Sequence, residues 1–300
     1  MTEWVAITNP AAGHGRCGKR AGAFIDRLRI AGVEVREEWT TRPGHATNIA
    51  RDAIQAGCLH FIAIGGDGTT NEVVNGIAEE DHLGTVVLAT LPLGTGNSFL
   101  ADFGLQDPDD ALAAIIRCDA PACDLIRCRI TNGDGQREYW CLNNIMAGFG
   151  ADVGALMNRR LKFLGESGYT VGVLIELARL NPPMIEIELD GETFSRRMVM
   201  VNVGNSQYTG GNMRISPESI VDDGLLDLII AENMSRAQLL TPFQRIFAGK
   251  HIGHPRITNL QGRRVRIASE RPLPLLIDGD TIGTTPLEAE VVPGAIRMVR

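Results

Sequence analysis

The sequence predicts an α/β protein with an N-terminal doubly wound parallel-sheet domain and a C-terminal antiparallel β-sandwich domain. In about the first 120 residues, short apolar runs alternate with helical patterns, which is typical of a parallel sheet with helices on both faces. Beyond Ala120, strand-like runs follow one another and are separated by turn dipeptides, as in antiparallel sheets. A chain of 300 residues is long enough to form two such cores.

In the first half, the predicted elements alternate strictly between strand and helix. Helices are recognised by apolar side chains at helical spacing, such as Ala21, Phe24, Ile25 and Leu28. We predict strands at 5–7, 33–35, 59–64 and 86–89, and helices at 19–30, 46–56, 71–78 and 109–116.

In the second half, most predicted elements are strands. They lie at 125–130, 139–146, 185–189, 198–203, 225–231, 265–268 and 273–277. Two helices are predicted at 169–180 and 235–247; Ser235 and Gln238 have capping-box spacing, and Pro242 is expected to kink or break the second helix.

Composition excludes several functional classes. The net charge of −7 provides no basic field for nucleic acid, so we expect no nucleic-acid partner. The six cysteines have neither a C-x-x-C pair nor zinc spacing, and the N-terminus does not resemble a signal peptide. We therefore expect a cytoplasmic protein with mostly reduced thiols.

Three glycine-rich turns follow predicted strands, at 9–13, 65–72 and 92–97. The carboxyl ends of parallel strands share one edge of the sheet, so these turns are expected to converge there. A glycine loop followed by a helix is a phosphate-binding arrangement, and Asp67 within it indicates an intervening cation. Thr69 and Glu72 also have capping-box spacing, so part of this pattern is explained equally well by a helix start.

Together these motifs resemble the catalytic domain shared by soluble diacylglycerol kinases, bacterial lipid kinases and sphingosine kinases. The turns match Asn-Pro-x-x-Gly, Gly-Gly-Asp-Gly-Thr-x-Asn-Glu-x-x-Asn-Gly and Pro-x-Gly-Thr-x-Asn. The resemblance covers nearly the whole chain. It implies an ATP-binding domain at 1–122, joined by a returning segment at about 288–300, and a lipid-substrate domain at 123–287.

The resemblance also implies residue roles. ATP is expected to contact Asn9, Pro10, Ala11, Ala12, Gly13, Thr40, Gly66, Asp67, Gly68, Thr69, Thr70, Asn71, Glu72 and Thr95. Asp67 would act through Mg²⁺ on the phosphates, and Asp280 matches the proton acceptor for the lipid hydroxyl. Asp278 and Asp124 match carboxylates that complete the active-site network. A structural Mg²⁺ is implied at Asp223 and the main-chain carbonyls of Ile220 and Leu225.

Two of these assignments have alternatives. Asp278-Gly279-Asp280 and Asp222-Asp223-Gly224 read equally as turns, because Asp-Gly is a common turn dipeptide. The family usually has Glu at the position of Asp280, and Asp where Ser98 follows Asn97.

The sequence therefore predicts an ATP- and Mg²⁺-dependent kinase acting on diacylglycerol or a related lipid alcohol and contacting the membrane peripherally. The mixed apolar and basic segment 156–164 is a candidate for that contact, although packing within its own domain is the favoured reading. The alternatives are an NAD kinase, which shares the Gly-Gly-Asp-Gly-Thr element, and a catalytically silent nucleotide- or lipid-binding protein. The oligomeric state is open between monomer and homodimer.

Overall fold

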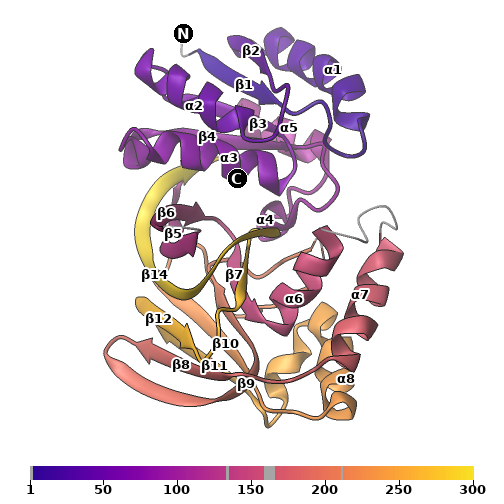
Figure 1. Cartoon of the computed structure of the whole chain (residues 1–300). Coiled ribbons are helices and arrows are strands. Elements are labelled where there is room, and N and C mark those ends of the chain that lie inside the picture. The colour runs from indigo at the N-terminus through magenta and orange to yellow at the C-terminus, as the bar shows by residue number, and fades with distance from the viewer. Residues whose placement is uncertain (1–2, 133–134, 159–165, 211) are drawn as a thin grey trace. The chain divides into compact units, whose positions relative to one another are not determined.

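The computed structural model describes residues 3–132, 135–158, 166–210 and 212–300, and the chain divides into two compact units (Figure 1). The first unit comprises Met1–Leu125 and Pro293–Arg300, and the second comprises Ile126–Val292. The boundaries predicted from the sequence lie a few residues from these positions.

The first unit contains a parallel sheet in the order β2-β1-β3-β4, to which the last residues of β14 (Asp280–Met298) add a further parallel strand. Its strands are β1 (Trp4–Thr8), β2 (Val35–Trp39), β3 (His60–Gly65) and β4 (Val87–Pro92). Its helices are α1 (Arg16–Ile30), α2 (His45–Gln55), α3 (Asp67–Ala78), α4 (Ser98–Ala101) and α5 (Pro108–Arg117), with a 3₁₀ turn η1 (Leu83–Thr85).

Both faces of this sheet are covered by helices. Helices α1 and α5 contact each other and share a core with alternate strand residues such as Ala6, Ile62 and Ala89. The intervening strand residues, such as Phe61 and Leu88, are also buried and must point to the other face, where α2 and α3 pack together. Strands buried on both sides explain the continuous apolar runs in the sequence.

The two largest errors in the predicted boundaries of this unit are four residues each. The second strand does not occupy 33–35; it begins at Val35 and continues through the polar residues Arg36, Glu37 and Glu38, because β2 is an edge strand. Helix α3 begins at Asp67, four residues before the predicted start. Asp67 is therefore the first helical residue and does not lie within the loop.

The second unit is largely antiparallel. Its strands are β5 (Ala122–Asn132, which starts in the first unit), β6 (Gly135–Cys141), β7 (Asn144–Gly148), β8 (Met184–Leu189), β9 (Glu192–Gly204), β10 (Leu226–Glu232), β11 (Ile257–Gly262), β12 (Arg264–Ser269), β13 (Pro274–Ile277) and β14 (Asp280–Met298, which ends in the first unit). Its helical segments are α6 (Phe149–Leu156), α7 (Glu166–Ala178), α8 (Arg236–Arg245), η4 (Ile246–Ala248) and η5 (Lys250–Gly253).

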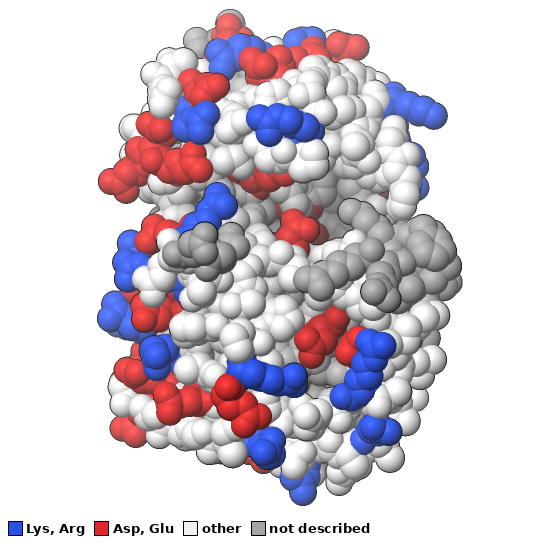
Figure 2. Space-filling model, in the orientation of Figure 1, with Lys and Arg blue, Asp and Glu red and all other residues white. Residues whose placement is uncertain are grey.

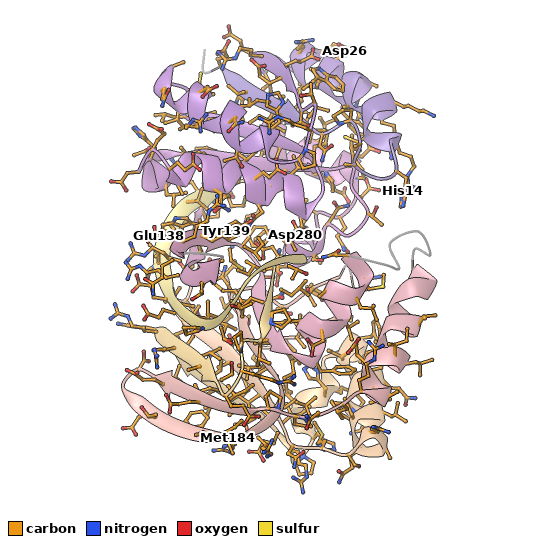
Figure 3. The ribbon with its side chains drawn as sticks, in the orientation of Figure 1. His14, Asp26, Glu138, Tyr139, Met184 and Asp280 are labelled. Carbon is orange, nitrogen blue, oxygen red and sulfur yellow. The ribbon has the colours of Figure 1, made fainter. Side chains whose placement is uncertain are left out.

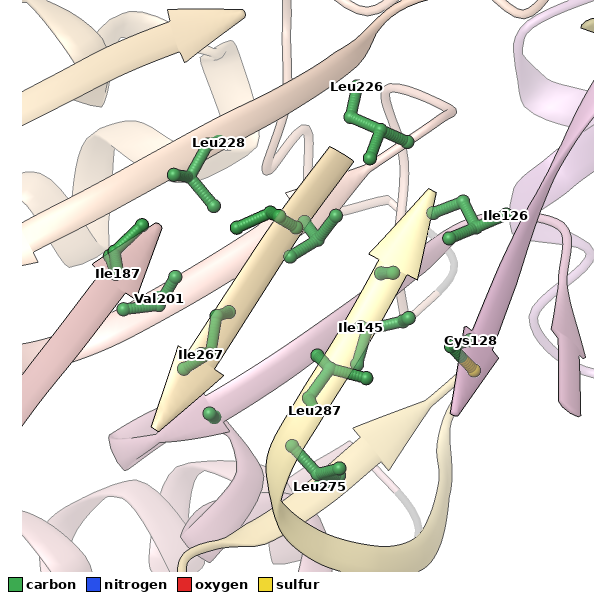
Figure 4. Packing of buried hydrophobic residues seen from close by; sticks show 14 of the residues in the cluster. Ile126, Cys128, Ile145, Ile187, Val201, Leu226, Leu228, Ile267, Leu275 and Leu287 are labelled. Carbon is green, nitrogen blue, oxygen red and sulfur yellow. The ribbon is translucent and has the colours of Figure 1, made fainter. Parts of the chain in front are cut away.

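One apolar cluster holds these strands together. Ile126, Ile145, Val201, Ile267 and Leu287 come from five different strands and are all at most 1% exposed (Figure 4). Strands alternate inward and outward residues, so each strand contributes one face to this core. On β8 and β12 the residues between the core positions are exposed and charged, such as Glu186, Glu188, Arg264 and Arg266. Figure 2 shows basic and acidic side chains interspersed over the visible surface.

The structure differs from the predictions for this half in several places. The strand predicted at 139–146 is two strands, β6 and β7, separated at Leu142 and Asn143. Pro242 lies inside α8 without ending it, while the predicted capping box of Ser235 and Gln238 is present. Helix α6, strand β11 and the full 19-residue length of β14 were not predicted.

Candidate functional site

The three glycine-rich turns of the first unit are in contact with one another. We call them together the glycine cradle, consisting of residues 9–15, 65–70 and 93–97. The Asn9 side-chain amide donates to Thr69 Oγ1 at 3.2 Å, and the Gly94 N–H donates to the Gly65 carbonyl at 2.6 Å. The predicted convergence of the turns at one sheet edge is therefore present in this unit.

Glycine is required in the cradle for packing between its turns. A Cβ atom on Gly94 would lie 2.4 Å from the Gly66 Cα, which no side chain could relieve because both atoms are main chain. A Cβ on Gly13, where φ is +59°, would lie 2.7 Å from the Leu93 carbonyl oxygen. These close main-chain contacts restrict the conformations of the cradle, which lowers the ordering cost of binding.

Asp67 connects two turns of the cradle. Its Oδ2 accepts a hydrogen bond from the Ser98 N–H at 2.8 Å and its Oδ1 accepts one from the Phe99 N–H at 3.2 Å. These are the first N–H groups of α4, so the carboxylate satisfies donors that the short helix leaves open. Carboxylate oxygen is the ligand type that Mg²⁺ takes, so the donor chemistry of Asp67 fits this ion.

Glu72 does not form the capping box that its spacing with Thr69 allows. Its carboxylate crosses to the start of α2 and accepts hydrogen bonds from the N–H groups of Gly44 at 2.9 Å and Ala46 at 3.1 Å. A carboxylate is stabilised at a helix N-terminus. Glu72 thereby fixes the segment that follows β2, in which Thr40 donates its N–H to the Thr8 carbonyl at 2.9 Å.

The other predicted ATP contacts differ in their surroundings. Gly68 and Thr95 are exposed at the cradle. Thr70 and Asn71 are buried, and their side chains hydrogen-bond to Thr90 and Asn75. The turn residues Pro10, Ala11 and Ala12 are organised by Asn9, whose Oδ1 accepts the Ala11 N–H at 3.1 Å and whose carbonyl accepts the Ala12 N–H. The geometry therefore favours Gly68 and Thr95 over Thr70 and Asn71 as side-chain or main-chain contacts to a ligand.

Asp124, also in the first unit, is buried and binds the returning chain. Its Oδ1 accepts the Gly294 N–H at 2.7 Å. This carboxylate positions the end of β14 beside β5, a structural role that exists whatever its part in catalysis.

In the second unit, Asp278 and Gly279 form the two-residue turn between β13 and β14. Their φ values of 48° and 90° are those of a type I′ turn, which matches strand twist and favours Asp-Gly. The turn reading is therefore confirmed. The Asp278 carboxylate also accepts hydrogen bonds from the N–H groups of Leu142 and Asn143, both at 2.8 Å, and from the Cys141 thiol at 3.1 Å.

These bonds explain why β6 and β7 are separate strands. The main chain at 142–143 donates to Asp278 and cannot continue the β ladder. Burial raises the pKa of Asp278, and the hydrogen bonds from Leu142, Cys141 and Asn143 oppose that rise. Asp278 is thus a structural anchor for the segment beside Asp280.

Asp280 is exposed at the first residue of β14, directly after this turn (Figure 3). Burial, followed by the negative charge of Asp278, raises the pKa of Tyr139, and the charge of Asp280 adds to the rise. Tyr139 therefore stays protonated near Asp280 at neutral pH. The exposed position suits a carboxylate that must reach a substrate hydroxyl.

At the predicted structural metal position, Asp223 Oδ1 accepts the Leu225 N–H at 2.9 Å across Gly224. Ile220 is 54% exposed nearby in the sequence. Among the described residues no three His, Cys, Asp or Glu side chains form a metal-binding group. One carboxylate and two carbonyls fit Mg²⁺ only if water supplies the remaining oxygens, because Mg²⁺ is octahedral.

Asp227, four residues later, was not predicted as a site residue. It is buried in β10, where burial raises the pKa of its carboxyl group and hydrogen bonds from the Asn259 and Gln261 side chains lower it in part. An aspartate inside an apolar strand was the signal that could have identified it.

The second unit also contains a small apolar pocket of about 60 Å³ that the sequence did not reveal. Its wall includes Met146, Val153, Met200, Met213, Phe243 and Ile246. These residues come from β7, α6, β9, the segment before β10, α8 and η4, and no local pattern in the sequence connects them.

Comparison with known proteins identifies the family. The model for the diacylglycerol kinase catalytic domain matches residues 3–128, and that for the YegS C-terminal NAD kinase beta sandwich-like domain matches residues 143–300. The probable lipid kinase YegS-like of Stenotrophomonas maltophilia is 32% identical over 295 residues, covering 94% of this chain and 93% of that protein. The chain belongs to the diacylglycerol kinase family of lipid kinases.

Other members and solved structures agree. A diacylglycerol kinase of Mycobacterium tuberculosis is 32% identical over 299 residues, 98% of this chain and 94% of that protein. A diacylglycerol kinase structure from Bacillus anthracis has a TM-score of 0.73 at 22% identity, covering 99% of this chain and 96% of that one. Yeast NADH kinase complexed with NADH shares only the fold, with a TM-score of 0.51 at 15% identity, covering 99% of this chain and 82% of that one.

Within the described ranges, no helix of this family member is both long and apolar enough to cross a membrane. Most of the segment 156–164, the sequence-based candidate for membrane contact, lies outside the described residues.

Proposed function

We propose that this protein is an ATP-dependent lipid kinase that transfers the γ-phosphate of ATP to the hydroxyl of diacylglycerol or a related lipid alcohol. Family membership supports a phosphotransferase acting on lipid. The glycine cradle is the observation that supports ATP binding. In it, the three turns and the start of α3 meet around main-chain N–H groups.

The cradle would hold the phosphates through main-chain donors at the start of α3, where the helix dipole also favours negative charge. Gly68 leaves this surface open, because no atom lies within 4 Å of the position that a Cβ would occupy. When bound, Mg²⁺ supplies the neutralisation of phosphate charge on which phosphoryl transfer depends. Asp67 would hold it, with its carboxylate oriented by the N–H groups of Ser98 and Phe99.

In the second unit, Asp280 would accept the proton of the lipid hydroxyl. The type I′ turn fixes the main chain before it, and the hydrogen bonds to Asp278 fix the turn. General-base assistance of this kind typically contributes about 10²–10⁴-fold to the rate.

The apolar pocket would accommodate part of an acyl chain. Its volume is small, but Met146, Met200 and Met213 line it, and methionine side chains change conformation at low cost. A pocket that opens around its ligand is consistent with an apolar substrate.

The decisive experiment offers the purified protein labelled ATP and Mg²⁺ with diacylglycerol, monoacylglycerol, phosphatidylglycerol, sphingoid bases and NAD in separate reactions. Phosphorylation of a lipid alcohol supports the proposal and names the substrate. Phosphorylation of NAD alone would instead support the NAD kinase reading, which the shared fold keeps as the second candidate. No phosphorylated product under any condition would favour a silent binding protein.

A further inference from the structure

The outer side of α8 and η4 carries exposed apolar side chains. Leu240 is 45% exposed and Phe247 is 53% exposed. Together with Ala237 and Gln244 they follow a spacing of three and four residues, which places them on one side of the helix. We call these four residues the α8 surface. All four are uncharged.

Cations flank this surface, and acids are absent from its segment. The sequence contains no Asp or Glu between Glu232 and Glu270, although the whole chain has a net charge of −7. Arg236, Arg245 and Lys250 are exposed, and within the described part of the chain none of them forms an ion pair. Basic residues beside an exposed apolar stripe are typical of helices that lie in a membrane interface.

The opposite side of the same helix forms a wall of the apolar pocket. Leu239, Pro242, Phe243 and Ile246 line the pocket, while Leu240 and Phe247 face outward. Pro242 has no N–H to donate, so this helix lacks one main-chain hydrogen bond in its middle. A single, weakened helical layer therefore separates the pocket from the α8 surface.

We propose that the α8 surface is a docking site for an anionic lipid bilayer. Leu240 and Phe247 enter the acyl boundary, and Arg236, Arg245 and Lys250 remain at the level of the headgroups. The proposal deepens the proposed lipid-kinase function, on which it rests for the identity of the partner. It assigns membrane contact to residues 236–250, next to the pocket proposed for the acyl chain.

The test measures sedimentation of the purified full chain with two kinds of vesicle, one of phosphatidylcholine alone and one containing about 30% phosphatidylglycerol. Wild-type protein should bind the anionic vesicles much more strongly than the phosphatidylcholine vesicles. Its binding to the anionic vesicles should weaken as salt is raised from 0.1 to 0.5 M, because the Debye length shortens to a few ångströms. Arg245→Gln and Lys250→Gln should each weaken binding about fivefold. Phe247→Ser should weaken it at least as much.

Ile116→Ser is the matched control, since Ile116 is 43% exposed but lies on α5 in the first unit. It should bind like wild type. All variants replace exposed residues, and unchanged circular dichroism would confirm that they fold. Undiminished vesicle binding by Phe247→Ser and Arg245→Gln would overturn the proposal. A second result would also overturn it: the wild type dimerises, Phe247→Ser abolishes the dimer, and the two proteins bind vesicles equally. The surface would then be a contact between copies of the chain.

A second readout separates this inference from the proposed function. Kinase activity is measured on short-chain diacylglycerol dispersed in detergent, where no bilayer is needed. Variants that keep this activity but lose vesicle binding support docking. If wild type phosphorylates no lipid yet binds anionic vesicles through the α8 surface, the kinase proposal fails and the docking site stands.

Discussion

The Asp67 carboxylate accepts the Ser98 N–H at 2.8 Å and so joins the first turn of α3 to the start of α4. Its other oxygen accepts the Phe99 N–H at 3.2 Å. Asp67, which the sequence assigns to cation binding, thus also has a structural role. Experiments must separate its effect on stability from its effect on activity.

Asp67→Ala removes both acceptors and is expected to reduce stability as well as activity. Hydrogen bonds to charged groups contribute about 1.5–3 kcal/mol each. Asp67→Asn keeps one acceptor and removes the charge, so it should retain most of the stability and still lose lipid phosphorylation by at least about 100-fold. Thermal unfolding and turnover of labelled ATP check the two effects. A fully active Asp67→Asn enzyme would contradict a role in holding Mg²⁺.

Asp280→Asn should lower kcat by about 10²–10⁴-fold while leaving the KM for ATP nearly unchanged, because the amide cannot accept the proton. Asp280→Glu is the matched variant. It restores the carboxylate with the longer side chain usual in the family and should retain measurable turnover. Steady-state kinetics on the lipid that the substrate panel identifies would measure both variants. A kcat of Asp280→Asn equal to that of wild type would remove this residue from the mechanism.

Asp278→Ala should destabilise the second unit by about 3 kcal/mol or more, because it leaves the N–H groups of Leu142 and Asn143 without their acceptor. The main chain at Asp278 has φ of 48°, which asparagine tolerates better than alanine. Asp278→Asn should therefore cost less. Urea unfolding measures both variants; equal stability of Asp278→Ala and wild type would show that the carboxylate is not an anchor.

Gly94→Ala should disturb the cradle, since its Cβ would collide with the main chain of Gly66. We expect a loss of ATP affinity of at least tenfold together with a lower melting temperature. Gly84→Ala is the control, because nothing lies within 4 Å of a Cβ there. ATP titration followed by fluorescence or calorimetry would compare them. Similar behaviour of the two variants would argue against close packing as the reason for Gly94.

Stability should depend on pH through Asp152. Burial first, and then the negative charge of Glu176, raise the pKa of Asp152 to about 6, while Arg271 opposes the rise. The folded state then holds a proton that the unfolded state releases near pH 4, so this residue's contribution declines as pH rises from about 4 to 6. Asp152→Asn cannot lose that proton. Its melting temperature relative to wild type should be higher at pH 7.5 than at pH 4, and a pH-independent difference would exclude the effect.

Much of the fold could be predicted because its strands and helices carry regular apolar patterns. The cradle was predictable for a further reason, since parallel strands deliver their carboxyl ends to one edge. The start of α3 was missed because Gly65, Gly66 and Gly68 read as loop, whereas Asp67 is favourable in the first turn of a helix. The N–H groups of Ser98 and Phe99 in the short helix α4 donate to Asp67, a contact that no local pattern encodes.

Long-range contacts account for the other failures. The run 139–146 is apolar except for Asn143 and Asn144. Asp278, more than 130 residues later, accepts the main-chain N–H groups of Leu142 and Asn143 where the run divides into two strands. The pocket likewise requires coordinates, since its residues come from separate segments. Conversely, the Asp278-Gly279 turn was recognisable from two residues, because type I′ geometry restricts its sequence so strongly.

The strand β14 ends in the first unit, where Arg297 and Met298 pair with Val87 and Leu88 of β4. The first unit is therefore discontinuous in the chain, and a fragment ending at Leu125 would leave β4 as an open edge with unpaired main-chain groups. Such edges recruit strands from other molecules. An isolated N-terminal fragment should consequently aggregate, whereas one fused through a short linker to residues 293–300 would retain the complete sheet.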